Sequence, residues 1–173
     1  MLLTNFILFQ IVWLACVAGA AKGLPWLGVA VTIVVLGWHL FKAKQAMTEL
    51  MLIVAALLIG ASFDQTMLSM EWVAYQQHGW SASLVPVWIL ALWGGFASTL
   101  NVSLAWMQQR YITSVLFGAA GGPLAYLGAE KIGAVALYGN TSYIALAVGW
   151  AVITPVLLHL AKRLNGLKTE RAR

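Results

Sequence analysis

Long apolar stretches separated by short polar turns occupy almost the whole chain and leave no room for a soluble domain. Each stretch is about 17–23 residues long, the length that an α-helix needs to cross a hydrocarbon layer of about 30 Å. The sequence therefore predicts an all-α, polytopic transmembrane helix bundle of about six helices, forming one domain over residues 1–163. The expected spans cover residues 4–21, 25–41, 50–67, 85–107, 112–129 and 142–161, followed by a short basic cytoplasmic tail at residues 164–173.

The composition supports a protein that is dissolved in lipid. Of its 173 residues, 62% are hydrophobic and only 9% are charged, whereas a soluble domain has roughly 25% charged residues. The net charge of +5 comes from basic residues at the ends of the apolar stretches and in the tail, not from a stripe along one face. We therefore expect the lipid bilayer as the main partner and no nucleic acid.

The placement of the basic residues predicts the orientation. If the spans alternate in direction, Lys22 and Lys131 lie on the side opposite to the chain ends, and all the other basic residues lie on the same side as the ends. Basic residues in short loops favour the cytoplasm, so both termini are expected there. The residues on the side of the chain ends are Lys42, Lys44, Arg110, Lys162, Arg163, Lys168, Arg171 and Arg173.

Asp64 is the strongest candidate for a functional residue, because it follows an apolar run and an ionisable group at membrane depth is costly. Glu71 and His78 follow at spacings of seven, which on one continuous helix would put all three on one face. The third helix would then continue to about Gln77 and carry an acidic stripe into the bundle. Alternatively, the helix ends near Met67, and Glu71 and His78 lie in a solvated loop. The sequence leaves both alternatives open.

The fourth stretch contains small and polar residues at helical spacing. Gly94 and Ser98, and likewise Gly95 and Thr99, lie four residues apart, a pattern that lets helices approach closely. Asn101 follows and, when buried, needs hydrogen-bond partners. A helix–helix contact and the lining of a polar cavity are both compatible with this pattern. Ser98, Thr99 and Asn101 therefore join Asp64 and Glu71 as a candidate polar intramembrane site.

The fifth stretch combines glycines with a proline. Gly118 and Gly122 form a GxxxG pair, and Gly121 lies beside them. Pro123 removes one backbone donor, so we expect it to break or kink the helix. A broken helix at membrane depth is tolerated where its backbone lines a cavity or is buried in protein, as in transporters.

No catalytic or metal-binding motif is present. The three histidines are scattered, and the single cysteine lies in an apolar run. We therefore predict no cofactor, no metal and no catalytic residue.

The run from Val85 to Trp93, the run from Phe96 to Trp106 and the run from Phe117 to Gly128 resemble a bacterial family of multi-pass membrane proteins labelled "domain of unknown function 2878". Residues 132–135 are similar to a part of the same family, and Asp64 matches an acidic residue in its third helix. The resemblance covers nearly the whole chain. It implies a bacterial inner (cytoplasmic) membrane setting and supplies no activity.

Three functions remain open from the sequence. A small transporter or lipid-handling protein would use Asp64, Glu71, Asn101 and a break at Pro123 as a polar path, and with so few helices a transporter would be expected to dimerise. A non-catalytic scaffold or accessory subunit would bind a second copy or another membrane protein through its small-residue helix faces. An intramembrane enzyme would use Asp64 and Glu71, but a seven-residue spacing separates them by about 10.5 Å along a helix, too far for a shared proton.

Overall fold

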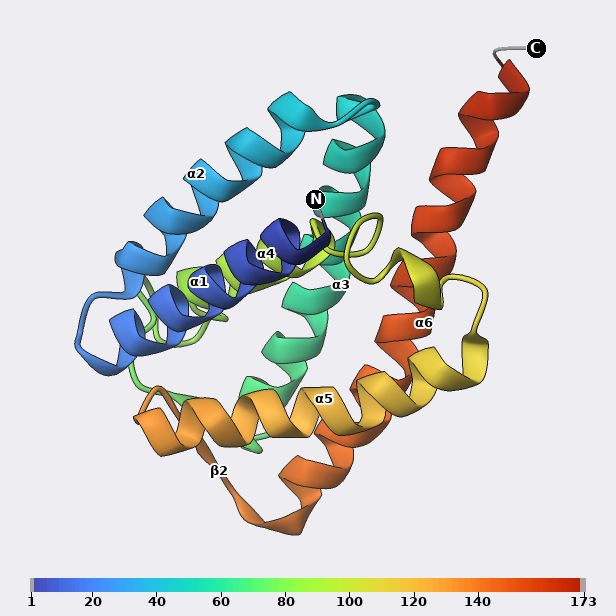
Figure 1. The fold of residues 1–173 in the computed structure, drawn as a ribbon. Helices are drawn as coiled ribbons and strands as arrows, with labels where there is room; N and C mark the ends of the chain where they lie inside the picture. The colour runs from blue at the N-terminus through green and yellow to red at the C-terminus, as the bar shows by residue number, and fades with distance from the viewer. Residues whose placement is uncertain (1, 172–173) are drawn as a thin grey trace.

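The computed structural model describes the backbone of residues 2–171 and the side chains of residues 2–165. Its described part contains six α-helices and two short strands (Figure 1). The elements are α1 (Leu2–Ala21), α2 (Pro25–Lys42), α3 (Ala46–Ser69), β1 (Val73–Tyr75), α4 (Val87–Ala97), the 3-10 turn η1 (Ala105–Met107), α5 (Tyr111–Ile132), β2 (Val135–Leu137) and α6 (Gly139–Arg171). The expected all-α membrane bundle is confirmed, and within the described residues α1, α2, α3, α5 and α6 are long and apolar enough to span a membrane.

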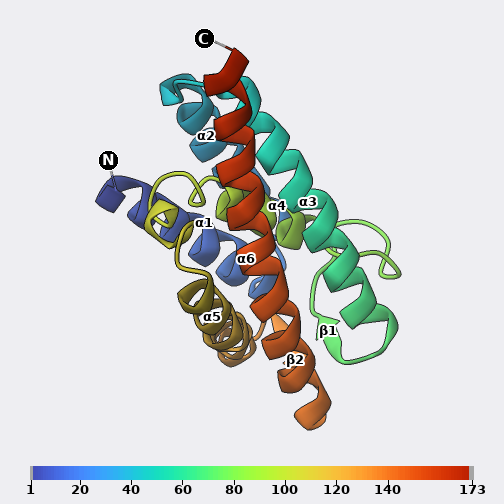
Figure 2. The ribbon, with the colours of Figure 1, turned by 90° about the vertical axis from the view of Figure 1, so that its right-hand side faces the viewer.

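Helices α3 and α6 run between two opposite ends of the bundle (Figure 1). In Figures 1 and 2 the turn between α2 and α3 and the C-terminal end of α6 lie at one end, and β1 and β2 lie at the other. The strands form an antiparallel ribbon that pairs Val73 with Leu137 and Tyr75 with Val135. This ribbon joins the segment after α3 to the turn between α5 and α6.

Helix α4 is the central element of the bundle and is only eleven residues long. It packs against α1, α2 and α3, and nearly all of its side chains are buried. At 1.5 Å per residue, α4 is about 16 Å long, which is about half of a hydrocarbon core. The prediction of one continuous helix over residues 85–107 is therefore wrong.

The fourth helix ends where hydroxyl side chains compete for its backbone carbonyls. Ser98 Oγ donates to the Gly95 oxygen at 2.7 Å, and Thr99 Oγ1 donates to the Phe96 oxygen at 2.6 Å. Hydroxyl bonds of this kind offer the backbone an alternative to continued helix. Residues 98–104 accordingly form a series of turns that leads to η1.

Two amide side chains satisfy the backbone of this non-helical segment. Asn5 of α1 donates to the Ser98 oxygen at 3.0 Å and accepts from the Ser103 backbone nitrogen at 3.3 Å. Gln108 donates to the Leu100 oxygen at 3.0 Å. Unsatisfied backbone groups are costly at membrane depth, so these bonds allow the chain to leave the helix there.

Helix α5, by contrast, is not broken at Pro123. It runs without interruption from Tyr111 to Ile132, so of the two outcomes expected at Pro123, a break or a kink, the break does not occur. A transmembrane helix tolerates the loss of one backbone donor when its neighbours pack against it.

The glycines of α4 and α5 are used for contacts within the chain. A Cβ atom on Gly118 would lie 2.1 Å from the Trp150 oxygen of α6, and one on Gly122 would lie 2.2 Å from the Trp150 ring. A Cβ atom on Gly95 would lie 2.8 Å from Val12 of α1. The expected close helix packing at these glycines is present, and it is internal to one chain.

The predicted tail begins inside α6. The helix continues to Arg171, while the side chains of residues 166–171, and residues 172 and 173 entirely, lie outside the described residues.

The packing of α5 on α6 predicts that Gly118→Ala lowers stability by about 1–3 kcal/mol, because the added methyl group meets backbone that has no room to move. Thermal or denaturant unfolding in detergent micelles measures this change. Gly121→Ala is the matched control, because a Cβ atom there meets only Phe117, at 4.0 Å. Equal stability of the two variants would contradict the packing described here.

Candidate functional site

Asp64 is completely buried and accepts three hydrogen bonds from aromatic side chains. The Tyr75 hydroxyl donates to Oδ1 at 2.8 Å, and the Trp93 indole N–H donates to Oδ2 at 2.6 Å. The Tyr126 hydroxyl also donates to Oδ1. The three donors are neutral, and no cation contacts the carboxylate among the described residues. Asp64 therefore joins four elements (α3, β1, α4 and α5) through hydrogen bonds alone.

The shorter of the two alternatives for the third helix is the one observed, and Asp64 is nevertheless buried. Helix α3 ends at Ser69, and Glu71 turns the chain with a positive φ of 56°. The chain then returns as β1, and its pairing with β2 places the Tyr75 hydroxyl on Asp64. Burial of Asp64 thus depends on the turn and the ribbon. It does not require α3 to extend beyond Ser69.

Trp93 and Trp150 form a pair of stacked rings between two glycines, and this arrangement crosses the bundle from α3 to α5. Its indole ring is stacked on Trp150 of α6, with centroids 4.7 Å apart and an interplanar angle of 13°. Gly60 of α3 lies under the Trp93 ring, and Gly122 of α5 lies against the Trp150 ring, because a Cβ atom at either glycine would come within about 2 Å of the ring. Asp64, one helical turn after Gly60, fixes the rotation of Trp93 through its N–H group.

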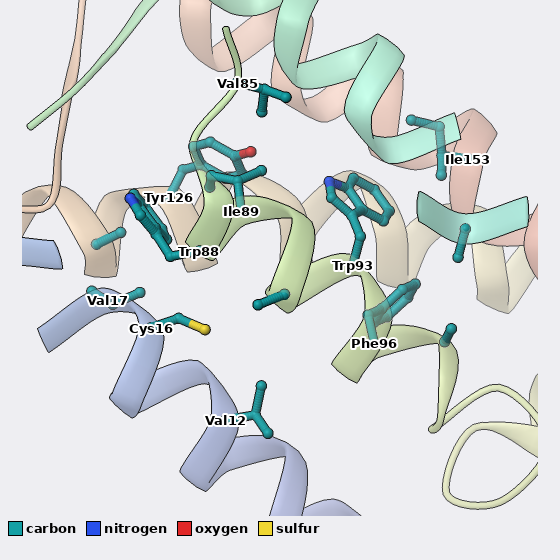
Figure 3. Packing of buried hydrophobic residues seen from close by; sticks show 14 of the residues in the cluster. Val12, Cys16, Val17, Val85, Trp88, Ile89, Trp93, Phe96, Tyr126 and Ile153 are labelled. Atoms are coloured by element: carbon teal, nitrogen blue, oxygen red, sulfur yellow. The ribbon is translucent and has the colours of Figure 1, made fainter. Parts of the chain in front are cut away.

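Figure 3 shows the Tyr126 hydroxyl oxygen and the Trp93 indole nitrogen turned toward each other beside α4. Both side chains reach the same carboxylate from different helices. Their rings also form part of the wall of a cavity. Asp64 therefore lies directly behind this wall and holds two of its side chains in place.

The cavity has a volume of about 220 Å³ and lies between α1 and α5, with α4 and Trp150 behind it. Its lining is almost entirely apolar and rich in aromatic rings. Gly121 faces this space, since a Cβ atom there would meet nothing closer than 4.0 Å. The main lining residues are Phe9, Gln10, Trp13, Trp88, Leu92, Trp93, Phe96, Phe117, Gly121, Ala125, Tyr126 and Trp150.

Asn101 belongs to a second polar cluster, separate from Asp64. Its Nδ2 donates to Glu49 Oε1 at 2.9 Å, and the other carboxylate oxygen of Glu49 lies 3.1 Å from His39 Nε2. Gln108 and Asn165 donate to the Asn101 side-chain oxygen at 2.9 and 2.8 Å. Glu49 lies 15 residues before Asp64, which is about 22 Å along α3. The expected polar site containing both Asp64 and Asn101 is therefore not formed as one site.

The remaining candidates lie apart from both clusters. Ser98 and Thr99 are buried, but their hydroxyls bond to their own helix end. Glu71 is exposed at its turn, and His78 Nδ1 lies 2.7 Å from the Leu84 oxygen in the following loop. Within the described residues, no group of three or more His, Cys, Asp or Glu side chains could hold a metal ion.

Several partners in these clusters were not identified from the sequence. Tyr75, Trp93 and Tyr126 are separated from Asp64 by 11, 29 and 62 residues. His39 and Glu49 lie near helix ends close to basic residues, so they resemble interfacial side chains. A signal was available at Gly60, since a glycine one turn before a buried carboxylate leaves space for a large flat ring.

The three donors on Asp64 predict that Asp64→Asn destabilises the chain by about 1–3 kcal/mol. The amide replaces one acceptor oxygen with an NH₂ group, which would face a hydroxyl or indole donor. Unfolding in detergent micelles measures the loss. Glu71→Gln, an equivalent change at the exposed turn, should leave stability unchanged. A midpoint for Asp64→Asn equal to that of the unaltered chain would contradict the bonding described.

Comparison with known proteins agrees with the resemblance noted in the sequence. The family described as "Protein of unknown function (DUF2878)" matches residues 2–156. No curated protein and no solved structure matches the chain. The match covers most of the chain, including α1 to α5, both strands and the part of α6 that carries Trp150. The chain belongs to the DUF2878 family of proteins of unknown function.

Proposed function

We propose that this protein is a lipid-handling membrane protein that holds a membrane-dissolved apolar molecule in the cavity between α1 and α5. The observation that carries the proposal is that Asp64 bonds to two side chains of the cavity wall, Trp93 and Tyr126. A buried carboxylate is expensive in a membrane, and by default indicates a function. Its role here is to position the wall and not to contact the occupant.

The shape of the cavity supports a binding role over a packing defect. Ligand sites are concave, mostly apolar and largely preformed. Here Gly121 of α5 faces open space, although Trp150 occupies the space beside the neighbouring Gly118 and Gly122. The same helix thus packs tightly on one face and leaves room on another.

Transport of a polar solute has less support. Such a protein needs a path of polar groups across the membrane, and Asp64 and Asn101 belong to separate clusters that bond to different partners. The lining of the cavity between α1 and α5 is apolar. These properties favour a molecule that enters from the bilayer itself.

The scaffold hypothesis has less support, because several of the small residues on which it depended pack inside the chain. Gly118 and Gly122 pack on Trp150, and Gly95 packs on Val12. These three glycines are therefore occupied by contacts inside the chain. We keep a bacterial inner membrane, with both termini in the cytoplasm, as the proposed setting, because basic residues collect near the helix ends on that side.

The proposal predicts that Gly121→Leu reduces binding of apolar molecules while the fold is retained, because the added side chain enters the cavity. Native mass spectrometry of the protein extracted with its lipids counts the molecules that remain bound. Ala120→Leu, one residue away on the exposed face of α5, is the matched control and should bind as the unaltered chain does. Equal retention in all three proteins would refute a role for the cavity.

A further inference from the structure

We infer that the occupant of the cavity is a flat conjugated ring with a carbonyl oxygen and an apolar tail, the chemistry of an isoprenoid quinone. This inference rests on the proposed function and specifies the molecule that the cavity takes. Gln10 of α1 is the residue that we assign to recognition of the carbonyl oxygen.

The lining contains polar groups that have no partner in the chain. Within the described residues, the Gln10 side-chain amide and the Trp13 indole N–H form no hydrogen bond. The Trp150 indole N–H is also without an acceptor, but protein atoms enclose it completely, so it is not exposed to the cavity. Two groups with N–H donors, Gln10 and Trp13 of α1, therefore border one apolar space. Unpaired donors of this kind cost free energy in a membrane, and an acceptor oxygen on a bound molecule would satisfy at least one of them.

The depth of these donors separates a quinone from a phospholipid. Gln10 and Trp13 lie eight and eleven residues after the start of α1, about 12 and 16 Å along the helix. Both positions are close to the middle of a hydrocarbon core about 30 Å thick. Acyl chains carry no hydrogen-bond acceptor at that depth, because their ester oxygens lie near the headgroups. A ring carbonyl on a molecule that is dissolved within the hydrocarbon core does lie at the depth of these donors.

The size and the walls of the cavity also fit a ring. An apolar cavity of about 150 Å³ in another protein accommodates benzene, so about 220 Å³ accommodates one substituted ring but no entire lipid. Aromatic side chains line the space, and flat rings pack on one another in stacked or edge-to-face geometry. The tail of the bound molecule would then extend into the bilayer.

The test compares decyl-benzoquinone with decylbenzene, which has the same tail and no carbonyl oxygen. Native mass spectrometry of the purified full chain gives the affinity for each probe. The unaltered chain should bind the quinone about tenfold more tightly, which is the worth of one good hydrogen bond. In Gln10→Met, which keeps an unbranched side chain of similar length without the amide, the ratio should fall to about one. Ile11→Met, on the exposed face of α1, is the matched control and should keep the preference.

The outcomes separate this inference from the proposed function. Equal affinity of the unaltered chain for both probes, with both weakened by Gly121→Leu, overturns recognition of a carbonyl and leaves the lipid-handling function standing. A quinone preference that persists in Gln10→Met overturns the assignment of Gln10. Absence of binding of either probe, or binding that Gly121→Leu leaves unchanged, overturns the proposed function and this inference together.

Discussion

The hydrogen bonds to Asp64 are the interactions on which the rest of the structure depends. A carboxylate within a membrane-spanning helix costs several kcal/mol unless it is satisfied, and here three aromatic donors satisfy it. Each donor comes from a different part of the chain, so all of these parts must be in place before the cost is offset. The carboxylate thereby makes the folding of α3, β1, α4 and α5 mutually dependent.

The stack of Gly60, Trp93, Trp150 and Gly122 extends this dependence across the bundle. Each glycine allows a ring to lie directly against a helix backbone, and the two rings lie on each other. Trp93 lies six residues, about 9 Å, after the start of the short helix α4. The non-helical segment that follows is tied by Asn5, while Asn101 connects it to Glu49. The two polar clusters thus act at different places. The hydrogen bonds of Asp64 order the cavity wall, and those of Asn101 hold the segment that follows the C-terminal end of α4.

The sequence predicted the class of fold well, because apolar length and charge placement directly reflect the bilayer. It also indicated Asp64, since a charge next to an apolar run is a strong local signal. The partners of Asp64 could not be predicted from the sequence. Tyr75 is placed next to Asp64 only by the pairing of two three-residue strands, and Tyr126 lies 62 residues further along the chain, on α5.

The end of the fourth helix at Ser98 was not predicted from the sequence, for a related reason. Pro123 is the stronger local signal for a break, but its helix is supported by packing and continues. At Ser98 and Thr99 the hydroxyls bond to the preceding carbonyls, and Asn5, 93 residues earlier, satisfies the released backbone. Serine and threonine occur both inside packed helices and at helix ends. Whether a helix continues or ends at such a residue therefore depends on the contacts that the rest of the fold makes there.

We propose that a molecule from the bilayer reaches the buried helix α4 through the space between α1 and α5. A lipid with a photoreactive diazirine in the middle of its acyl chain measures this directly, with the labelled residues identified by peptide mass spectrometry. We expect labelling of the cavity residues Leu92 and Phe96 on α4, in addition to outward-facing residues such as Leu116 and Leu124. Labelling confined to the outward-facing residues, with α4 unmodified, would contradict it.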